Sequence, residues 1–184
     1  MKFWASLVGY QLVWFTAVIG AGRGLAWPGI VAALLYAAGQ LATTRLYKTN
    51  LSLMATAMVM GLLVDSGLIH AGLARFAAPW PMTGLTPAWI LALWVAFSLT
   101  FTQSLAYLQT RLWLAALLGA LGGPLAYLGA QRGWQAITIS DPSWPALLYL
   151  SVGWGLATPS FAWLARRQSA DVLPALISLL GSAQ

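Results

Sequence analysis

Three ionisable side chains are the residues of this sequence best suited to chemistry: Asp65, His70 and Arg23. Asp65 lies about 14 residues into a long apolar segment, which places it roughly 21 Å along a helix that rises about 1.5 Å per residue. A carboxyl group at that depth in an apolar helix must be protonated, paired with a cation or open to water. His70, and Arg23 in the glycine-rich stretch at 20–24, are expected at a similar level, so the three side chains could converge on one polar pocket.

Two interpretations of these residues remain open on the sequence alone. In the first, Arg23 neutralises Asp65 and joins the first apolar segment to the third. In the second, Asp65 handles a proton or a cation in a pocket that opens to one side of a membrane. A catalytic triad of Asp65, Ser66 and His70 is excluded in either case, because His70 lies about 140° around a helix from Asp65 and so faces away from it.

The composition excludes several other chemistries. The chain has no cysteine, one histidine and three acidic residues, which are too few for an ordinary three- or four-ligand metal site. Two histidine ligands to one haem are impossible within one chain for the same reason. Asp141 and Asp171 fall at opposite ends of the apolar segments, so paired carboxylates for acid/base catalysis are not expected. The sequence therefore predicts no metal and no cofactor, and it leans against an enzyme.

A second group of polar residues is expected nearer the other end of the apolar segments. Thr100, Gln103, Ser104 and Tyr107 recur at helical spacing along the fourth segment, and Gln11 lies on the first. Polar side chains in membrane helices usually hydrogen-bond to a neighbouring helix, and each such bond contributes about 0.6 kcal/mol. The stripe is therefore interpreted first as a helix contact, with a path for a substrate as the alternative.

Small residues on the fifth segment indicate helix packing. Gly119 and Gly123 are four residues apart, with Gly122 beside them, and such a pair lets two helix backbones approach closely. Pro124 follows at once and is expected to kink or loosen the helix, because proline lacks the backbone N–H that an interior position uses. These residues predict packing and carry no chemistry.

The elements that position these residues are apolar segments of membrane-spanning length. The chain is 60% hydrophobic and 7% charged, whereas a soluble domain carries about 25% charged residues. The net charge of +6 comes from dispersed Lys and Arg residues, not from the clustered basic face that a nucleic-acid-binding protein uses. A spanning helix needs about 20 mostly apolar residues, and six segments qualify: about 3–20, 25–41, 51–73, 88–108, 112–128 and 145–164. Residues 1–184 are therefore predicted to form a single all-α transmembrane domain with six spans.

The basic residues also predict an orientation. One side of the predicted bundle collects Lys2, Arg45, Lys48, Arg111, Arg166 and Arg167, and the other side collects Arg23, Arg75 and Arg132. Cytoplasmic loops carry the excess of Lys and Arg in membrane proteins, so both termini are expected in the cytoplasm. The apolar tail at 171–181 is too short to span and could lie on the inner membrane surface.

Three stretches of the sequence together resemble a known family. They read YQLVWFTAVIGAG at 10–22, LVDSGLIHAGLARF at 63–76 and LLGALGGPLAYLGA at 117–130. They are similar, in this order, to a bacterial family of small polytopic inner-membrane proteins, the domain-of-unknown-function family 2878. Matching positions are Gln11, Trp14, Asp65, His70, Gly122, Gly123 and Pro124. At Gln103 the family pattern often has a histidine, and glutamine keeps the hydrogen bonding of that residue but cannot carry its proton.

The resemblance implies a fold and a location in the bacterial inner membrane, but no activity. It also implies an association with enzymes that modify membrane fatty acids, because relatives are often encoded near proteins similar to cyclopropane-fatty-acid synthases. Membrane lipids, and membrane-bound or peripheral lipid-modifying enzymes, are therefore the expected partners, and nucleic acid is not. The oligomeric state is left open.

Three classes of function follow. The first is a non-catalytic component that binds lipid or holds partner enzymes at the membrane. The second is a small transporter that uses Asp65 as its proton or cation site. The third is an intramembrane enzyme that acts on a lipid chain with Asp65 and His70 as acid and base. The first class is favoured, because the chain carries almost no reactive side chains.

Overall fold

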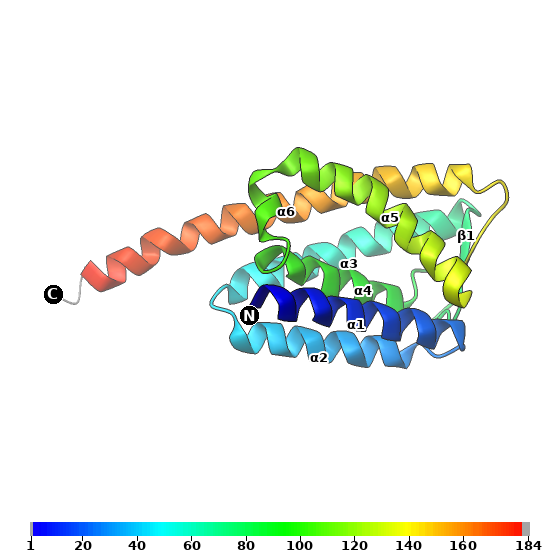
Figure 1. Ribbon diagram of the computed structural model, residues 1–184, viewed down its shortest axis with the longest axis horizontal. Coiled ribbons are helices and arrows are strands. Elements are labelled where there is room, and N and C mark those ends of the chain that lie inside the picture. The colour runs from blue at the N-terminus through cyan, green and yellow to red at the C-terminus, as the bar shows by residue number, and fades with distance from the viewer. Residues whose placement is uncertain (1, 182–184) are drawn as a thin grey trace.

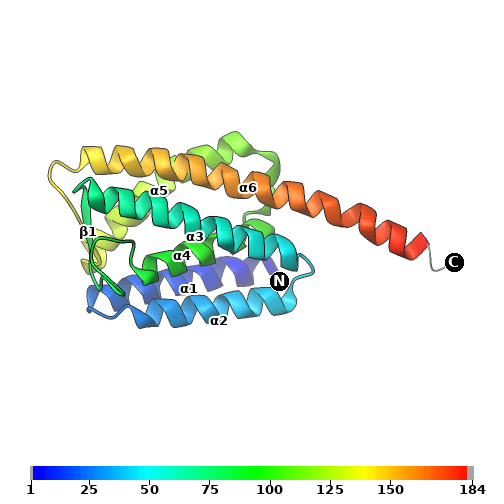
Figure 2. The ribbon, with the colours of Figure 1, turned by 180° about the vertical axis from the view of Figure 1, so that it is seen from behind.

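Helices form most of the computed structural model, which describes residues 2–181 and the side chains of residues 3–169. The six α-helices of this part of the chain lie side by side along one axis (Figures 1 and 2). They are α1 (Lys2–Gly22), α2 (Trp27–Thr43), α3 (Tyr47–His70), α4 (Ala88–Leu99), α5 (Leu112–Trp134) and α6 (Trp144–Gly181). The predicted all-helical class is confirmed. The tail at 171–181 has no described side chains, so its predicted place on the membrane surface lies outside the described residues.

Four of the described helices are long and apolar enough to cross a membrane. These candidate spans are Phe3–Gly22, Tyr47–His70, Leu112–Trp134 and Trp144–Ser169. The other two predicted spans correspond to shorter helices, because α2 has 17 residues and α4 has 12. Length and composition therefore support a membrane protein with four candidate spans, and six spans remain a prediction.

Helix α4 is the most buried helix of the bundle. Its buried side chains include Trp89, Leu93, Trp94 and Leu99, which point in different directions around the helix. A helix that is apolar all round belongs inside a bundle, where it has neighbours on every side. Helix α4 packs against α1, α2 and α3, and it supplies the inner wall for the site described below.

The fourth predicted segment does not stay helical to residue 108. Helix α4 ends at Leu99 and is followed by two short 3-10 helices, η1 (Thr100–Thr102) and η2 (Ala106–Thr110). The Thr100 hydroxyl donates to the Phe97 carbonyl at 2.5 Å, and the Gln109 carboxamide donates to the Phe101 carbonyl at 2.8 Å. Such side-chain bonds compete with the backbone bonds of an α-helix. The predicted polar stripe on one helical face is therefore wrong for this segment.

Two short strands join the loops at one end of the bundle. Strand β1 (Ala74–Phe76) follows α3, and strand β2 (Ile137–Ile139) follows α5. They pair antiparallel with Arg75 opposite Thr138, and the first and third residues of each strand are buried. This sheet could not be predicted from the sequence, because strands of three residues are too short to show an alternating pattern. Its consequence is that the α3–α4 and α5–α6 connections are held together.

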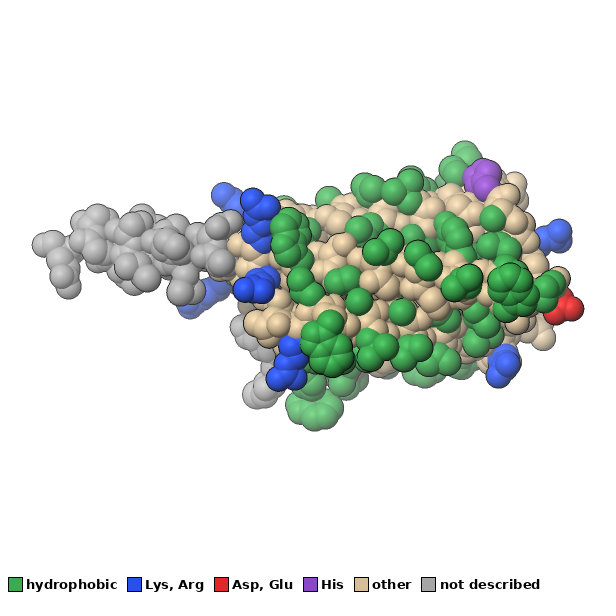
Figure 3. Space-filling view, turned by 90° about the horizontal axis from the view of Figure 1, so that it is seen from above, with side chains coloured by type: hydrophobic (Ala, Val, Ile, Leu, Met, Phe, Trp, Pro, Cys, Tyr) green, Lys and Arg blue, Asp and Glu red, His purple; other side chains and the backbone are tan. Residues whose placement is uncertain are grey.

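The outer surface of the described bundle is apolar between two charged ends. Figure 3 shows one face, with hydrophobic side chains along its length and Lys and Arg side chains towards its ends. Large side chains in mid-helix are widely exposed, among them Leu35 at 70%, Leu63 at 68% and Leu125 at 64%. A soluble monomer rarely exposes so continuous an apolar surface, whereas lipid chains would cover it.

Candidate functional site

Asp65 is the buried carboxyl of this bundle, with 0% of its surface exposed. Its Oδ2 accepts a hydrogen bond from Trp94 Nε1 at 2.7 Å, and its Oδ1 accepts one from the Tyr127 hydroxyl. The two donors belong to α4 and α5, so the carboxyl on α3 joins three helices. Because each oxygen has a neutral donor, the cost of burying this polar group is offset without a cation.

Two glycines make room for the indole rings beside Asp65. A Cβ atom at Gly61, one turn before Asp65, would lie 2.6 Å from the Trp94 ring. Trp94 stacks on Trp154 of α6 with ring centroids 4.0 Å apart and planes 15° apart. Trp154 in turn lies over Gly123 of α5, where a Cβ atom would come within 2.4 Å of its Cγ. The hydrogen bond to Asp65 is therefore positioned by a stack that only glycines can admit.

The predicted convergence of Asp65, His70 and Arg23 is not found. Arg23 is exposed in the α1–α2 turn, and no ion pair joins it to Asp65 in the described part of the chain. His70 is also exposed, and its Nδ1 lies 2.7 Å from the Ser66 carbonyl on its own helix. The three side chains do not meet because they point in different directions. The Asp65 side chain points into the bundle towards α4 and α5, whereas the Arg23 and His70 side chains lie on the surface of the bundle.

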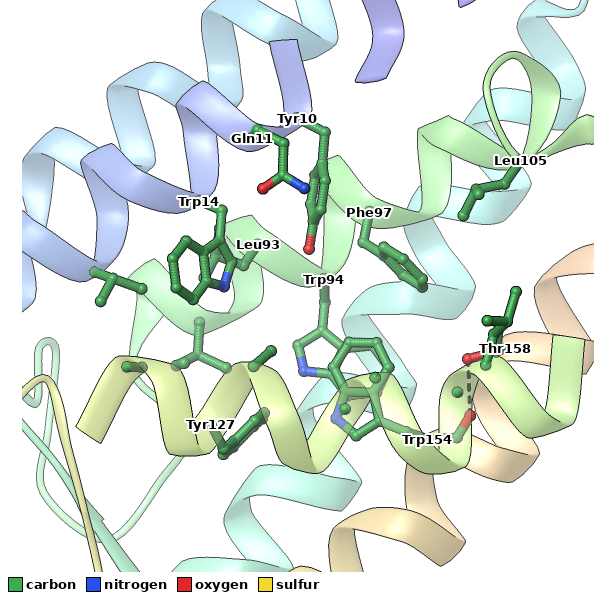
Figure 4. A pocket seen from close by; sticks show the side chains of 18 of the residues that line it. Tyr10, Gln11, Trp14, Leu93, Trp94, Phe97, Leu105, Tyr127, Trp154 and Thr158 are labelled. Atoms are coloured by element: carbon green, nitrogen blue, oxygen red, sulfur yellow. Dashed lines mark hydrogen bonds between the residues drawn. The ribbon is translucent and has the colours of Figure 1, made fainter. Parts of the chain in front are cut away.

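A cavity of about 360 Å³ lies on the other side of the two donors to Asp65. Figure 4 shows it between α1 and α5, with side chains from α4 and α6 also reaching it. Aromatic rings supply much of its wall: Tyr10 and Trp14 from α1, Trp89, Trp94 and Phe97 from α4, Tyr127 from α5 and Trp154 from α6. Since Trp94 and Tyr127 line the cavity and also bind Asp65, the carboxyl lies directly behind the cavity wall.

The polar groups of the cavity are few, and several of them, the buried Trp154 Nε1 included, have no hydrogen-bond partner among the described residues. The Tyr127 hydroxyl is used by Asp65, and the Thr158 hydroxyl donates to the Trp154 carbonyl at 2.8 Å. The Tyr10 hydroxyl and the Gln11 carboxamide form no hydrogen bond within the described part of the chain, and both are directed into the cavity in Figure 4. The described residues that line the cavity include no Lys, Arg, His, Asp or Glu.

Of the secondary candidates predicted from the sequence, Gln11 lines this cavity and the others do not. Thr100 is buried and bonded to its own segment, Gln103 is half-buried, and Tyr107 is 47% exposed. The segment that carries them still matters for the site, because Leu105 and Leu108 close one part of the cavity. It thus contributes apolar wall and not the polar path that was the alternative interpretation.

Comparison with known proteins places the chain in a family. Residues 3–160 match the family model described as Protein of unknown function (DUF2878). The chain belongs to this family. The resemblance predicted from the three sequence stretches is therefore confirmed, and the match covers nearly all of α1, the whole of α2 to α5 and α6 as far as Ser160. No curated protein and no solved structure matches the chain.

The three glycines singled out on α5 all line the cavity, but only two of them also pack against another helix. Gly119 and Gly123 lie against α6, where a Cβ atom at Gly119 would come within 2.2 Å of the Trp154 carbonyl oxygen. Gly122 lines the cavity, and a Cβ atom there would meet nothing within 4 Å. Helix α5 continues through the buried Pro124.

Sequence reasoning missed the two donors to Asp65 and the aromatic wall. Trp94 and Tyr127 lie in segments that look uniformly apolar, so nothing nearby marks them as polar partners. The available signal was the residue type: a buried Trp or Tyr carries one polar group that needs a hydrogen-bond partner. A carboxyl without a nearby cation, together with Trp and Tyr on other helices, is the pattern that could have pointed to this network.

Proposed function

We propose that this protein is a non-catalytic membrane component that binds the apolar chain of a lipid in the cavity between α1 and α5. The observation that carries the proposal is the cavity of about 360 Å³ with its aromatic wall. Lipid tails are as apolar as these side chains, so burial alone does not favour the bound state inside a membrane. Selection of one lipid therefore depends on shape, on ring contacts and on hydrogen bonds.

The setting we propose is the bacterial inner membrane, with six crossings and both termini in the cytoplasm. The charged ends of the bundle support it, since Arg45, Lys48, Arg111, Arg166 and Arg167 belong to one end, and Arg23, Arg75 and Arg132 to the other. Helix α2 is about 26 Å long at 1.5 Å per residue, close to the thickness of a hydrocarbon core. Lipid-modifying enzymes at the membrane are the partners that this role would serve.

A non-catalytic role fits the surroundings of the reactive groups. An enzyme with Asp65 as acid and His70 as base requires both to reach one substrate atom, yet Asp65 is buried and His70 is exposed. A transporter that uses Asp65 is the second candidate. It is favoured by one observation, the position of the carboxyl directly behind a cavity wall formed by Trp94 and Tyr127.

The test is retention of lipid by the purified protein. Mass spectrometry of the detergent-solubilised protein should find a lipid at a stoichiometric level, well above its share of the bulk membrane. Gly122→Leu should lower this retention about tenfold, because the new side chain enters open space in the cavity. Gly39→Leu on α2 is the matched control, since a Cβ atom there also meets nothing within 4 Å and Gly39 does not line the cavity. Equal retention by wild type and Gly122→Leu would remove the cavity as the binding site.

A further inference from the structure

Tyr10 and Gln11 are polar residues near the middle of a membrane-spanning helix. They lie about 12–14 Å from the first residue of α1 and about 17–18 Å from its last at 1.5 Å per residue, inside a hydrocarbon core about 30 Å thick. Water is scarce at that depth, and a polar group left without a partner there is costly. The Tyr10 ring is oriented by contact with Phe97, at a centroid distance of 5.6 Å. A ligand that hydrogen-bonds to these two residues would satisfy both.

Other hydroxyl groups inside the bundle have protein partners. Ser6 Oγ lies 3.1 Å from the Tyr36 hydroxyl and 3.1 Å from Ser104 Oγ, which ties α1 to α2 and to the segment after α4. Ser66 Oγ lies 2.9 Å from the Thr86 hydroxyl in the same way. These pairs have the packing role expected of polar residues in membrane helices. Tyr10, which is half-buried, and Gln11, which is exposed, differ from them in facing the cavity without such a partner.

The charge of the cavity excludes an anionic ligand group at this position. None of the described lining residues is charged, so a phosphate beside Tyr10 would lie in an apolar region without a counter-charge. The Asp65 carboxyl lies behind Trp94 and Tyr127, and an acidic group offers no positive charge to an anion. A carboxamide both donates and accepts hydrogen bonds, and a phenol donates one, so a neutral carbonyl or hydroxyl group suits both.

We propose that the cavity takes a neutral lipid, which has a long apolar chain and an uncharged carbonyl or hydroxyl group bound by Tyr10 and Gln11. This inference rests on the proposed function, because it names the class of lipid for the same cavity. Two sources share the required chemistry: a glycerolipid without phosphate and an isoprenoid quinone. Each combines apolar chains with an uncharged oxygen group that the two side chains can bind.

The experiment measures the binding of three probes to the delipidated full-length protein in detergent by native mass spectrometry. The probes are a diacylglycerol, a phosphatidylglycerol with the same acyl chains and an isoprenoid quinone. At least one neutral probe should bind about tenfold more tightly than phosphatidylglycerol. Whichever neutral probe binds more tightly identifies the source of the ligand.

Variants that remove one polar group at nearly constant shape complete the test. Tyr10→Phe and Gln11→Leu should each weaken binding of the neutral probe about fivefold. Tyr107→Phe is the matched control, because Tyr107 is exposed and lies outside the cavity lining. An unchanged melting temperature and gel-filtration profile will show that each variant is folded.

The outcomes separate the two proposals. If phosphatidylglycerol binds as tightly as the neutral probes, or if Tyr10→Phe and Gln11→Leu both bind like wild type, the neutral-lipid inference is overturned. The proposed function still stands in that case, provided that Gly122→Leu lowers lipid retention. If the wild-type protein binds none of the probes and retains no lipid, both proposals are wrong.

Discussion

Tyr127 on α5 donates a hydrogen bond to Asp65 on α3, a residue 62 positions earlier in the chain. The same tyrosine lines the cavity on its other side. One side chain therefore joins the buried carboxyl to the wall of the proposed binding site. A change at Asp65 can reach the cavity through this residue and through Trp94, without any direct contact between Asp65 and a bound lipid.

Two replacements of Asp65 should distinguish the contribution of its hydrogen bonds to stability from that of its charge. Asp65→Leu leaves the Trp94 N–H and the Tyr127 hydroxyl without their acceptor, and it should lower the free energy of unfolding by about 2–4 kcal/mol. Asp65→Asn should cost less than about 1 kcal/mol, because the carboxamide can accept from Trp94 and donate to the rotatable Tyr127 hydroxyl. Thermal unfolding in detergent measures both. Arg23→Gln should leave the melting temperature unchanged, and a loss equal to that of Asp65→Leu would restore the predicted ion pair.

The bond between Tyr127 and Asp65 should appear as a coupling in a double-mutant cycle. Tyr127→Phe alone removes the donor to Oδ1, and Asp65→Leu alone removes the acceptor. Together they should cost less than the sum of the single changes, with a coupling of about 0.5–3 kcal/mol. The cycle needs reversible unfolding of the four proteins in mixed micelles. Fully additive losses would mean that the two groups do not interact.

Two neighbouring glycines on α5 should respond to alanine in opposite directions. Gly123→Ala places a Cβ atom 2.4 Å from Trp154 Cγ, so the α5–α6 contact must open, at a cost of about 1–3 kcal/mol. Gly122→Ala meets nothing within 4 Å and should stabilise the helix by up to about 1 kcal/mol. Melting temperatures of the two variants compare positions with nearly the same backbone. Similar shifts for both would contradict the close packing at Gly123.

His70 should be dispensable for lipid retention. Its side chain is exposed, bonded to the Ser66 carbonyl, and not part of the cavity lining. His70→Gln should therefore retain as much lipid as wild type in the mass-spectrometric assay. Loss of a lipid-modifying activity in this variant, with lipid retention intact, would instead favour the intramembrane enzyme that uses Asp65 and His70.

The orientation of the bundle can be tested with reporters. A reporter fused after Arg167 should be active in the cytoplasm, and one inserted near Thr83 should be active on the outer side, because the first end carries the larger number of Lys and Arg residues. Alkaline phosphatase and green fluorescent protein give opposite signals on the two sides. The reverse pattern would show that the bundle is inserted the other way round.

The composition and the order of the residues were sufficient for the class of this protein. Apolar segments of spanning length can satisfy their backbone groups in lipid only as helices or closed barrels, so the helical class follows from length and hydropathy. The family could also be identified from the sequence, because the order of residues within the three matching stretches is itself the evidence for it. Asp65 also stood out by itself, since a carboxyl in an apolar helix is unusual wherever its partner lies.

The partners of Asp65, the end of α4 and the cavity were decided only by the tertiary structure. Trp94 and Tyr127 are 29 and 62 positions away from Asp65, and spacing along one helix carries no information about residues on another. Helix α4 ends at Leu99, and the Thr100 hydroxyl and the Gln109 carboxamide bond locally in the segment that follows, which hydropathy does not record. The cavity lies between α1 and α5, whereas Gly119 and Gly123 allow α5 to pack closely against α6. That balance of close and distant helix contacts depends on all of the packed side chains together, and so no single segment of the sequence contains it.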